Sequence, residues 1–197
     1  MNKALRILQN MDEPAAATVR ARIGDIDAAA TLRRQAAYIH QLLNTAGDLC
    51  IDMTEPLRRC GGCCLSASAV KTAKKLHAQS ADTAEFLRLL NEANLGGGQL
   101  RIESGRIIAV YTRCYCNIPK AAKQLNPRYC ECSAGWYQRL FTESFGRPVS
   151  VCIRESIAGG APQCTFEITD YDSRWCCGST LQAAEGGQLP SRGALKP

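Results

Sequence analysis

The chain has 197 residues, 24 lysines and arginines against 18 aspartates and glutamates, and twelve cysteines. A chain of this length can bury a hydrophobic core without disulfide bonds, so the small secreted disulfide scaffold is disfavoured. We find no apolar run of membrane-spanning length and no secretory signal, so the cysteines predict metal or thiol chemistry in a cytoplasmic protein. The net charge of +6 is scattered and lacks interleaved aromatic residues, so neither a nucleic-acid partner nor a membrane is expected.

The first half of the sequence predicts helices, because apolar residues recur at helical spacing between stop signals. These helices are expected at about residues 14–23, 27–45 and 66–79, and then from a cap at Asp82 or Thr83 through Leu90. Residues 51–63 contain a proline and two adjacent glycines, so we expect a connection there.

After the glycines at 96–98 the apolar period changes from helical to extended. Strands are expected at about residues 99–103, 106–113, 148–155 and 163–170, with a helix from Ser133 to about Phe145. The predicted fold class is therefore α+β, with helices packed on a four-stranded antiparallel sheet. The expected parts are a helical N-terminal extension (1–48), an α/β domain (49–170) and a flexible C-terminal tail (171–197).

Two Cys-x-Cys pairs are the strongest chemical signal: Cys114 with Cys116, and Cys130 with Cys132. In an extended segment, residues two apart project to the same side, so each pair presents two sulfurs together. Four thiolates suit a tetrahedral soft metal site, which predicts zinc, or alternatively an iron–sulfur cluster. Reversibly oxidised thiols and plain core packing remain the other interpretations.

A second cluster, Cys60-Gly-Gly-Cys63-Cys64, matches the Cys-x-x-Cys spacing of dithiol oxidoreductases, but no strand is predicted before it. Cys64 can equally complete a metal shell. This cluster and the Cys130 pair each precede a predicted helix start, where the helix dipole favours thiolates, so both are expected to be reactive. A third cluster is Cys176-Cys177.

The segment 129–168 resembles the C-terminal half of the 4-vinyl reductase-like domain, which belongs with the ligand-binding domains of nitric-oxide signalling and Golgi-transport proteins. The similar features run in chain order: an aromatic helix ending in Phe145-Gly146, a strand through Val149 and Val151, Ser156-Ile157, Gly160, and Cys164-x-Phe166-x-Ile168. The chain is most similar to a cysteine-rich bacterial branch with Cys-x-Cys and Cys-Gly-x-Cys-Cys clusters.

The resemblance implies an apolar pocket for a small ligand, enclosed by helices and an antiparallel sheet. Some sensor relatives carry a cysteine-ligated zinc, and Cys130, Cys132 and Cys164 are the positions that match such ligands. The extra cysteines and the absence of an attached output domain depart from those sensors. We expect the aromatic helix, through Trp136, Tyr137 and Phe141, to line part of the pocket.

The leading hypothesis is therefore a metal-binding protein with zinc at the two Cys-x-Cys pairs and a pocket for a small apolar ligand. The alternative is an enzyme, either a thiol redox protein acting through Cys60 and Cys63 or an iron–sulfur reductase. A third interpretation is a homodimer formed through the N-terminal helices, because the amphipathic stripe within residues 13–45 needs a cover.

Overall fold

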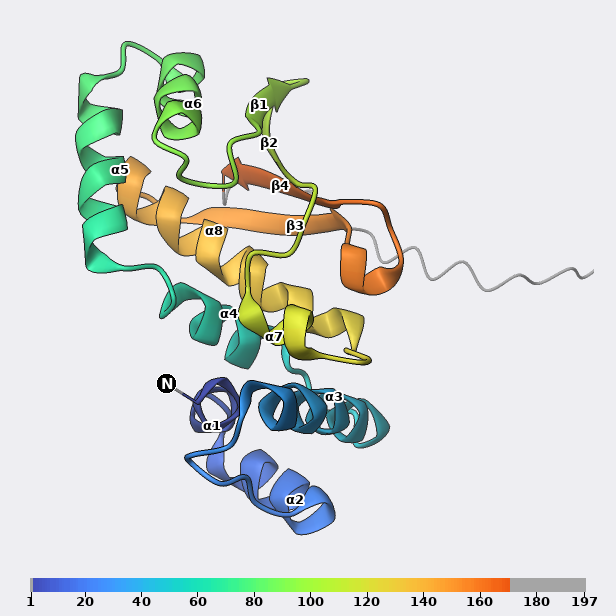
Figure 1. Ribbon diagram of the computed structural model, residues 1–197. Coiled ribbons are helices and arrows are strands. Elements are labelled where there is room, and N and C mark those ends of the chain that lie inside the picture. Colours follow the sequence, from blue (N-terminus) through green and yellow to red (C-terminus); the bar gives the residue numbers. More distant parts are fainter. Residues whose placement is uncertain (1, 171–197) are drawn as a thin grey trace, which may run out of the picture.

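The computed structural model describes residues 2–170 and confirms the predicted α+β class (Figure 1). Four helices make up the N-terminal part of the fold: α1 (Lys3–Gln9), α2 (Glu13–Ile23), α3 (Leu32–Asp48) and α4 (Thr54–Gly62). The helices that follow are α5 (Ala67–Gln79), α6 (Thr83–Glu92), α7 (Asn117–Ala121) and α8 (Glu131–Phe145), with 3-10 turns η1 (Pro127–Cys130) and η2 (Ile157–Gly159). Capping side chains at Asp12, Ser66 and Asp82 begin α2, α5 and α6, and the cap at Asp82 is one of the two that the sequence predicts for α6.

The antiparallel sheet has the strand order β1-β2-β4-β3. Its strands are β1 (Leu100–Glu103), β2 (Arg106–Tyr111), β3 (Val149–Glu155) and β4 (Cys164–Asp170). Ser104 and Gly105 join β1 to β2 with positive φ angles of 49° and 74°, as a two-residue hairpin turn requires. Tyr111 at the end of β2 pairs with Cys164 at the start of β4, so that register brings the segment after β2 close to Cys164.

Two hydrophobic cores meet along α8. The N-terminal core packs α1–α4 with Ile118 of α7 and Tyr129 of η1, and the first turn of α8 adds Cys132. The sheet core packs α5, α6 and the rest of α8 on one face of the sheet, with Tyr137 and Phe166 fully buried at its centre. Figure 1 shows α8 running beside the sheet and above the N-terminal helices.

The predicted connection at residues 51–63 is wrong, because residues 54–62 form α4. Pro56 lies in the first turn of this helix, where its missing N–H costs nothing. The two glycines lie at the helix end, and Gly61 and Gly62 face α8 rather than a turn. The adjacent helices differ from prediction at their starts: α3 begins after Thr31 and α8 at Glu131, while α1 and α7 were not predicted.

Close approach of α4 and α8 depends on two glycines. A Cβ on Gly61 would lie 1.7 Å from the Cys132 carbonyl oxygen, and a Cβ on Gly135 would lie 2.1 Å from the Arg58 carbonyl oxygen. The Arg58 side chain ties the same helices together: its Nε donates to Glu131 at 2.8 Å, and its terminal nitrogen donates to the Val151 carbonyl of β3 at 2.8 Å. The two helices are therefore held in backbone contact.

The stripe that predicted a dimer is covered within the chain. Ala36, Ile39 and Leu43 of α3 are buried in the N-terminal core, while Leu32 remains 46% exposed. Dimerisation stays a prediction. The N-terminal core also draws on α4, α7 and η1, so its packing extends beyond the predicted extension of residues 1–48.

The predicted tail, with Cys176 and Cys177, lies outside the described residues. Within the described range, no helix combines the length and the apolar character that crossing a bilayer requires.

Candidate functional site: a cysteine-lined pocket

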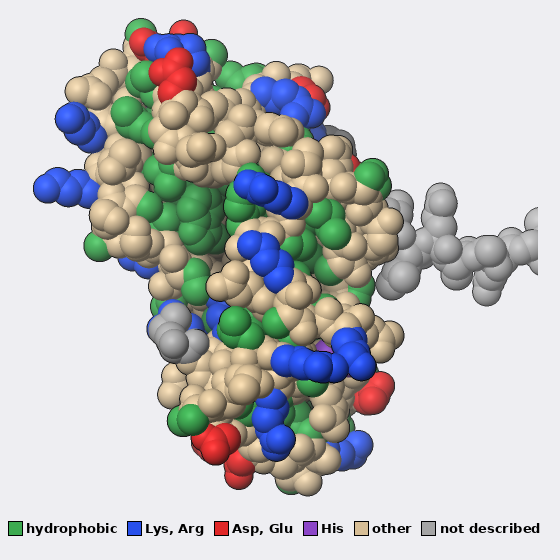
Figure 2. All heavy atoms as spheres, in the orientation of Figure 1, with side chains coloured by type: hydrophobic (Ala, Val, Ile, Leu, Met, Phe, Trp, Pro, Cys, Tyr) green, Lys and Arg blue, Asp and Glu red, His purple; other side chains and the backbone are tan. Residues whose placement is uncertain are grey.

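A cavity of about 700 Å³ lies where the two cores meet. Its wall comes from α1, the end of α4, the loop after α6, the segment from the end of β2 into α7, η1, the start of α8, η2 and β4. Six cysteines line it: Cys64, Cys114, Cys116, Cys130, Cys132 and Cys164. On the face drawn in Figure 2, hydrophobic side chains gather in a hollow with Lys and Arg side chains beside it.

Three of these thiols, which we call the Cys164 group, are joined by hydrogen bonds: Cys114, Cys130 and Cys164. Cys164 is the common acceptor. The hydrogen bond from Cys130, and those from the Ile157 N–H and Cys114, lower the pKa of Cys164 to about 6 against the opposing effect of burial. Donating to Cys164, together with burial, raises the pKa of Cys130. Burial is the main cause that raises the pKa of Cys114.

A second set, which we call the Lys3 group, contains Lys3, Cys60, Cys64 and Cys132. The Lys3 Nζ lies 2.6 Å from the Cys64 sulfur and also donates to Cys132. A hydrogen bond from Cys60 is the main cause that lowers the pKa of Cys132 to about 6, and the Lys3 ammonium adds to it. The same hydrogen bond raises the pKa of Cys60. Burial opposes the charge on Lys3, but the adjacent sulfurs raise the pKa of Lys3 above its ordinary value.

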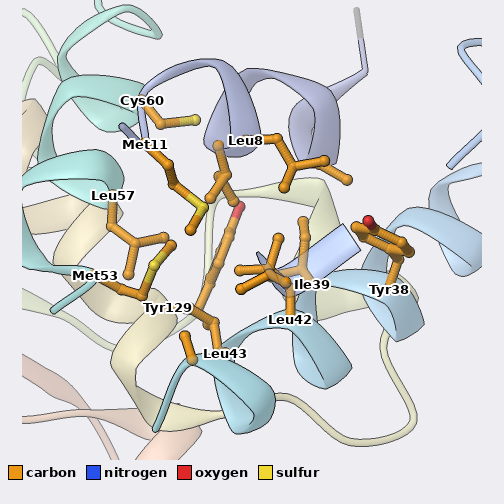
Figure 3. Close-up of a cluster of buried hydrophobic side chains, with 14 of the residues drawn as sticks. Leu8, Met11, Tyr38, Ile39, Leu42, Leu43, Met53, Leu57, Cys60 and Tyr129 are labelled. Atoms are coloured by element: carbon orange, nitrogen blue, oxygen red, sulfur yellow. The ribbon is translucent and has the colours of Figure 1, made fainter. Parts of the chain in front are cut away.

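Tyr129 connects the N-terminal core to the pocket. Its hydroxyl lies 3.2 Å from the Cys116 sulfur and also donates to Cys132. Figure 3 shows the Tyr129 ring in the N-terminal core together with Cys60, Leu57 and other apolar side chains. Burial raises the pKa of Tyr129, so this hydroxyl keeps its proton and remains a donor to the sulfurs.

The four predicted metal ligands therefore lie on one pocket wall but in different hydrogen-bond groups. Cys114 and Cys130 belong to the Cys164 group, Cys132 belongs to the Lys3 group, and Cys116 contacts Tyr129. Among residues 2–170, no three side chains of His, Cys, Asp or Glu are placed to hold one metal ion.

The other predicted site residues divide between the pocket and the interior. Cys60 is buried behind Cys132, Cys64 lines the pocket, and Cys63 is exposed and does not belong to its wall. Trp136 borders the cavity. Tyr137 and Phe141 instead lie in the sheet core with no exposed surface.

A position before a helix start does not set the pKa of these cysteines in the way that the sequence analysis expected. Cys60 lies in the last turn of α4 instead of before a helix, and its pKa is raised because it donates a hydrogen bond. Cys130 occupies the N-cap position of α8, yet its pKa is also raised, because it donates to Cys164. Partners from distant segments therefore decide which sulfurs are stabilised as thiolates.

Sequence reasoning missed several residues of this site, among them Lys3, Tyr129 and Arg113. A signal for the first was present, because Ala4, Ile7, Leu8 and Met11 follow helical spacing and predict a buried helix that would carry Lys3 inward. No local pattern indicates that Tyr129 reaches two cysteines, because those contacts depend on how η1 packs.

Residues 31–175 match the family model described as "Family of unknown function (DUF6144)". The chain belongs to this family. The match covers most of the chain and all of the pocket wall except Lys3, which α1 contributes from outside the matched region. A search of curated proteins found no match for this DUF6144 member.

Proposed function

We propose that this DUF6144 protein binds a zinc ion through the Cys164 group and presents it to a small ligand in the pocket. The observation that carries this proposal is the meeting of Cys114, Cys130 and Cys164 at one cavity wall. They come from the segment after β2, the start of α8 and the start of β4. Three thiol ligands with a cavity beside them resemble the donor pattern of zinc sites that keep one position open.

The chemistry of the donor set fits zinc, since thiolate sulfur is a soft ligand. The side chains must move for zinc to bind, because the sulfurs of Cys114 and Cys130 hydrogen-bond to Cys164 and the three do not surround a common metal position. Coordination therefore requires the thiols to turn toward a common centre. Cys114 lies in a connecting segment where such rotation is least constrained by regular structure.

A second candidate occupant is an iron–sulfur cluster. The observation that favours it is the number of thiols, because six cysteines line one cavity and a cluster needs four ligands over a wider span than a single ion. In that case Cys116 and Cys132, which are two of the four ligands predicted from sequence, would join the Cys164 group. A cluster would favour a reductase activity.

We infer that the DUF6144 fold is related to the 4-vinyl reductase-like domain. The order of α8, β3, η2 and β4, with Gly146 ending α8 in a left-handed conformation, supports this relationship. So does the pocket enclosed between helices and an antiparallel sheet. A cytoplasmic location is supported by nine free thiols within residues 2–170.

Metal analysis of purified protein tests the zinc proposal. We expect about one equivalent of zinc in the wild type, and at least a ~100-fold weaker zinc affinity in Cys164→Ser, which loses the sulfur shared by the group. Cys63→Ser is the matched control, because Cys63 is exposed and does not line the pocket, and it should retain the wild-type zinc affinity.

Two results would contradict the proposal. One is zinc and iron together below about a tenth of an equivalent after purification without added metal. The other is equal zinc affinity in Cys164→Ser and wild type. A coloured protein with iron and inorganic sulfide, obtained under anaerobic conditions, would replace zinc with the cluster.

A further inference from the structure

We propose that Cys60 and Cys132 form a redox-active dithiol that reduces small anionic disulfides admitted by the pocket. These thiols lie outside the Cys164 group, so the proposal adds an activity to the proposed metal site. It stands on three features of the structure: the contact between the two thiols, the cation beside them and the charge of the pocket wall.

Both thiols are buried, but only Cys132 borders the cavity. Cys132 lies on the pocket wall, whereas Cys60 has no exposed surface and donates its hydrogen bond to Cys132 from behind. The close backbone contact at Gly61 holds α4 and α8 together at this point. A disulfide in the pocket can therefore reach Cys132 but not Cys60, and Cys60 is in place to resolve the product.

Lys3 supplies the charge that this reaction needs. Lys3 is 8% exposed, and the ionisable groups that act on it are the sulfurs of Cys60, Cys64 and Cys132. Burying an ammonium group is costly unless an opposite charge or acceptor compensates it. Lys3 can therefore stabilise negative charge on Cys132 as this sulfur attacks and leaves.

The wall of the pocket favours an anionic substrate. Lys3 and Arg113 are both on it, and no Asp or Glu is among the described residues that line it. Tyr111, Tyr115 and Trp136 add aromatic surface for the body of a small molecule. A disulfide with carboxylate groups matches this combination better than a cationic one.

The exchange conserves atoms and electrons. The Cys132 thiolate attacks one sulfur of the incoming disulfide, forms a mixed disulfide and releases the first thiolate, which takes a proton. Cys60 then loses its proton and attacks the Cys132 sulfur, releasing the second thiol and leaving the Cys60–Cys132 disulfide. The protein dithiol is oxidised by two electrons, and the small disulfide is reduced to two thiols.

The test exposes the reduced full chain to oxidised glutathione, blocks the remaining thiols and maps tryptic peptides without reduction. We expect a disulfide between peptides 60–71 and 129–139 in the wild type and in Cys63→Ser, because Cys63 is exposed and does not line the pocket. Cys60→Ser should stop at the mixed disulfide on Cys132, which adds one glutathionyl mass. Cys132→Ser should form neither product. Thermal unfolding of both variants shows whether they fold.

Substrate charge gives a second readout. Oxidised glutathione should react about tenfold faster than the cationic disulfide cystamine, and Arg113→Gln should reduce this difference. The proposal is overturned if no link forms in the wild type, if the link persists in Cys132→Ser, or if cystamine reacts faster. Cys164→Ser should keep the exchange while losing zinc, so failure of this activity and failure of the metal proposal are separate results.

Discussion

Gly61→Ala is expected to destabilise the protein by about 3 kcal/mol, because overpacking at a rigid contact is costly. The added Cβ would lie 1.7 Å from the Cys132 carbonyl oxygen, which is backbone and cannot rotate away. Gly135→Ala should behave alike, since its Cβ would lie 2.1 Å from the Arg58 carbonyl oxygen. Each variant forces α4 and α8 apart at the point where Cys60 meets Cys132. The free energy of unfolding in urea measures the effect.

Gly47→Ala is the matched control for these two variants. Gly47 also lies in a helix, α3, but a Cβ there would have no neighbour within 4 Å. Alanine should stabilise this exposed position by a few tenths to about 1 kcal/mol, because it restricts the unfolded chain. If Gly61→Ala and Gly47→Ala unfold at the same urea concentration, the close helix contact is contradicted.

Arg58→Met is expected to cost about 2–4 kcal/mol, because it leaves a charge and a carbonyl without their partner. The side chain bridges Glu131 of α8 and the Val151 carbonyl of β3, and the side chains of Arg58 and Glu131 are only 19% and 24% exposed. Methionine preserves much of the packing volume but none of these hydrogen bonds. The free energy of unfolding of Arg58→Lys should fall between those of the wild type and Arg58→Met, since lysine keeps the charge but lacks the planar guanidinium group. Urea unfolding again gives the comparison.

Arg88→Met provides the control for this prediction. Arg88 on α6 pairs with Glu85 and Glu92, but its side chain is 56% exposed. Losing such a surface pair should change the free energy of unfolding by less than about 1 kcal/mol. If Arg58→Met is no less stable than Arg88→Met, the hydrogen bonds of Arg58 to α8 and β3 do not stabilise the fold.

Much of the fold follows from local sequence signals. Helices α2, α5 and α6 begin at side-chain caps, and the β1–β2 turn uses Ser104-Gly105, so short-range chemistry determines these elements. The connection predicted around Gly61-Gly62 was wrong, because adjacent glycines usually end a helix or strand. Here the missing side chain of Gly61 allows helix contact with Cys132, a residue 71 positions away.

The grouping of the cysteines was not predictable from their spacing. Adjacent members of a Cys-x-Cys pair go to different groups: Cys130 meets Cys164, whereas Cys132 meets Cys60. The pairing of Tyr111 with Cys164 in the sheet brings Cys164 to the segment that holds Cys114. Strand register and helix crossing are set by the whole core, so a count of intervening residues cannot reveal them.

Lys3 lies outside the region that matches DUF6144, residues 31–175, so a protein cut to that region would lack one residue of the pocket wall. A truncated protein starting at residue 31 would lose α1 and the ammonium group that contacts Cys64 and Cys132. Its thiols would then react or bind metal under a different local charge. An affinity tag fused immediately before α1 would likewise lie next to this wall, because Lys3 is the first residue of that helix.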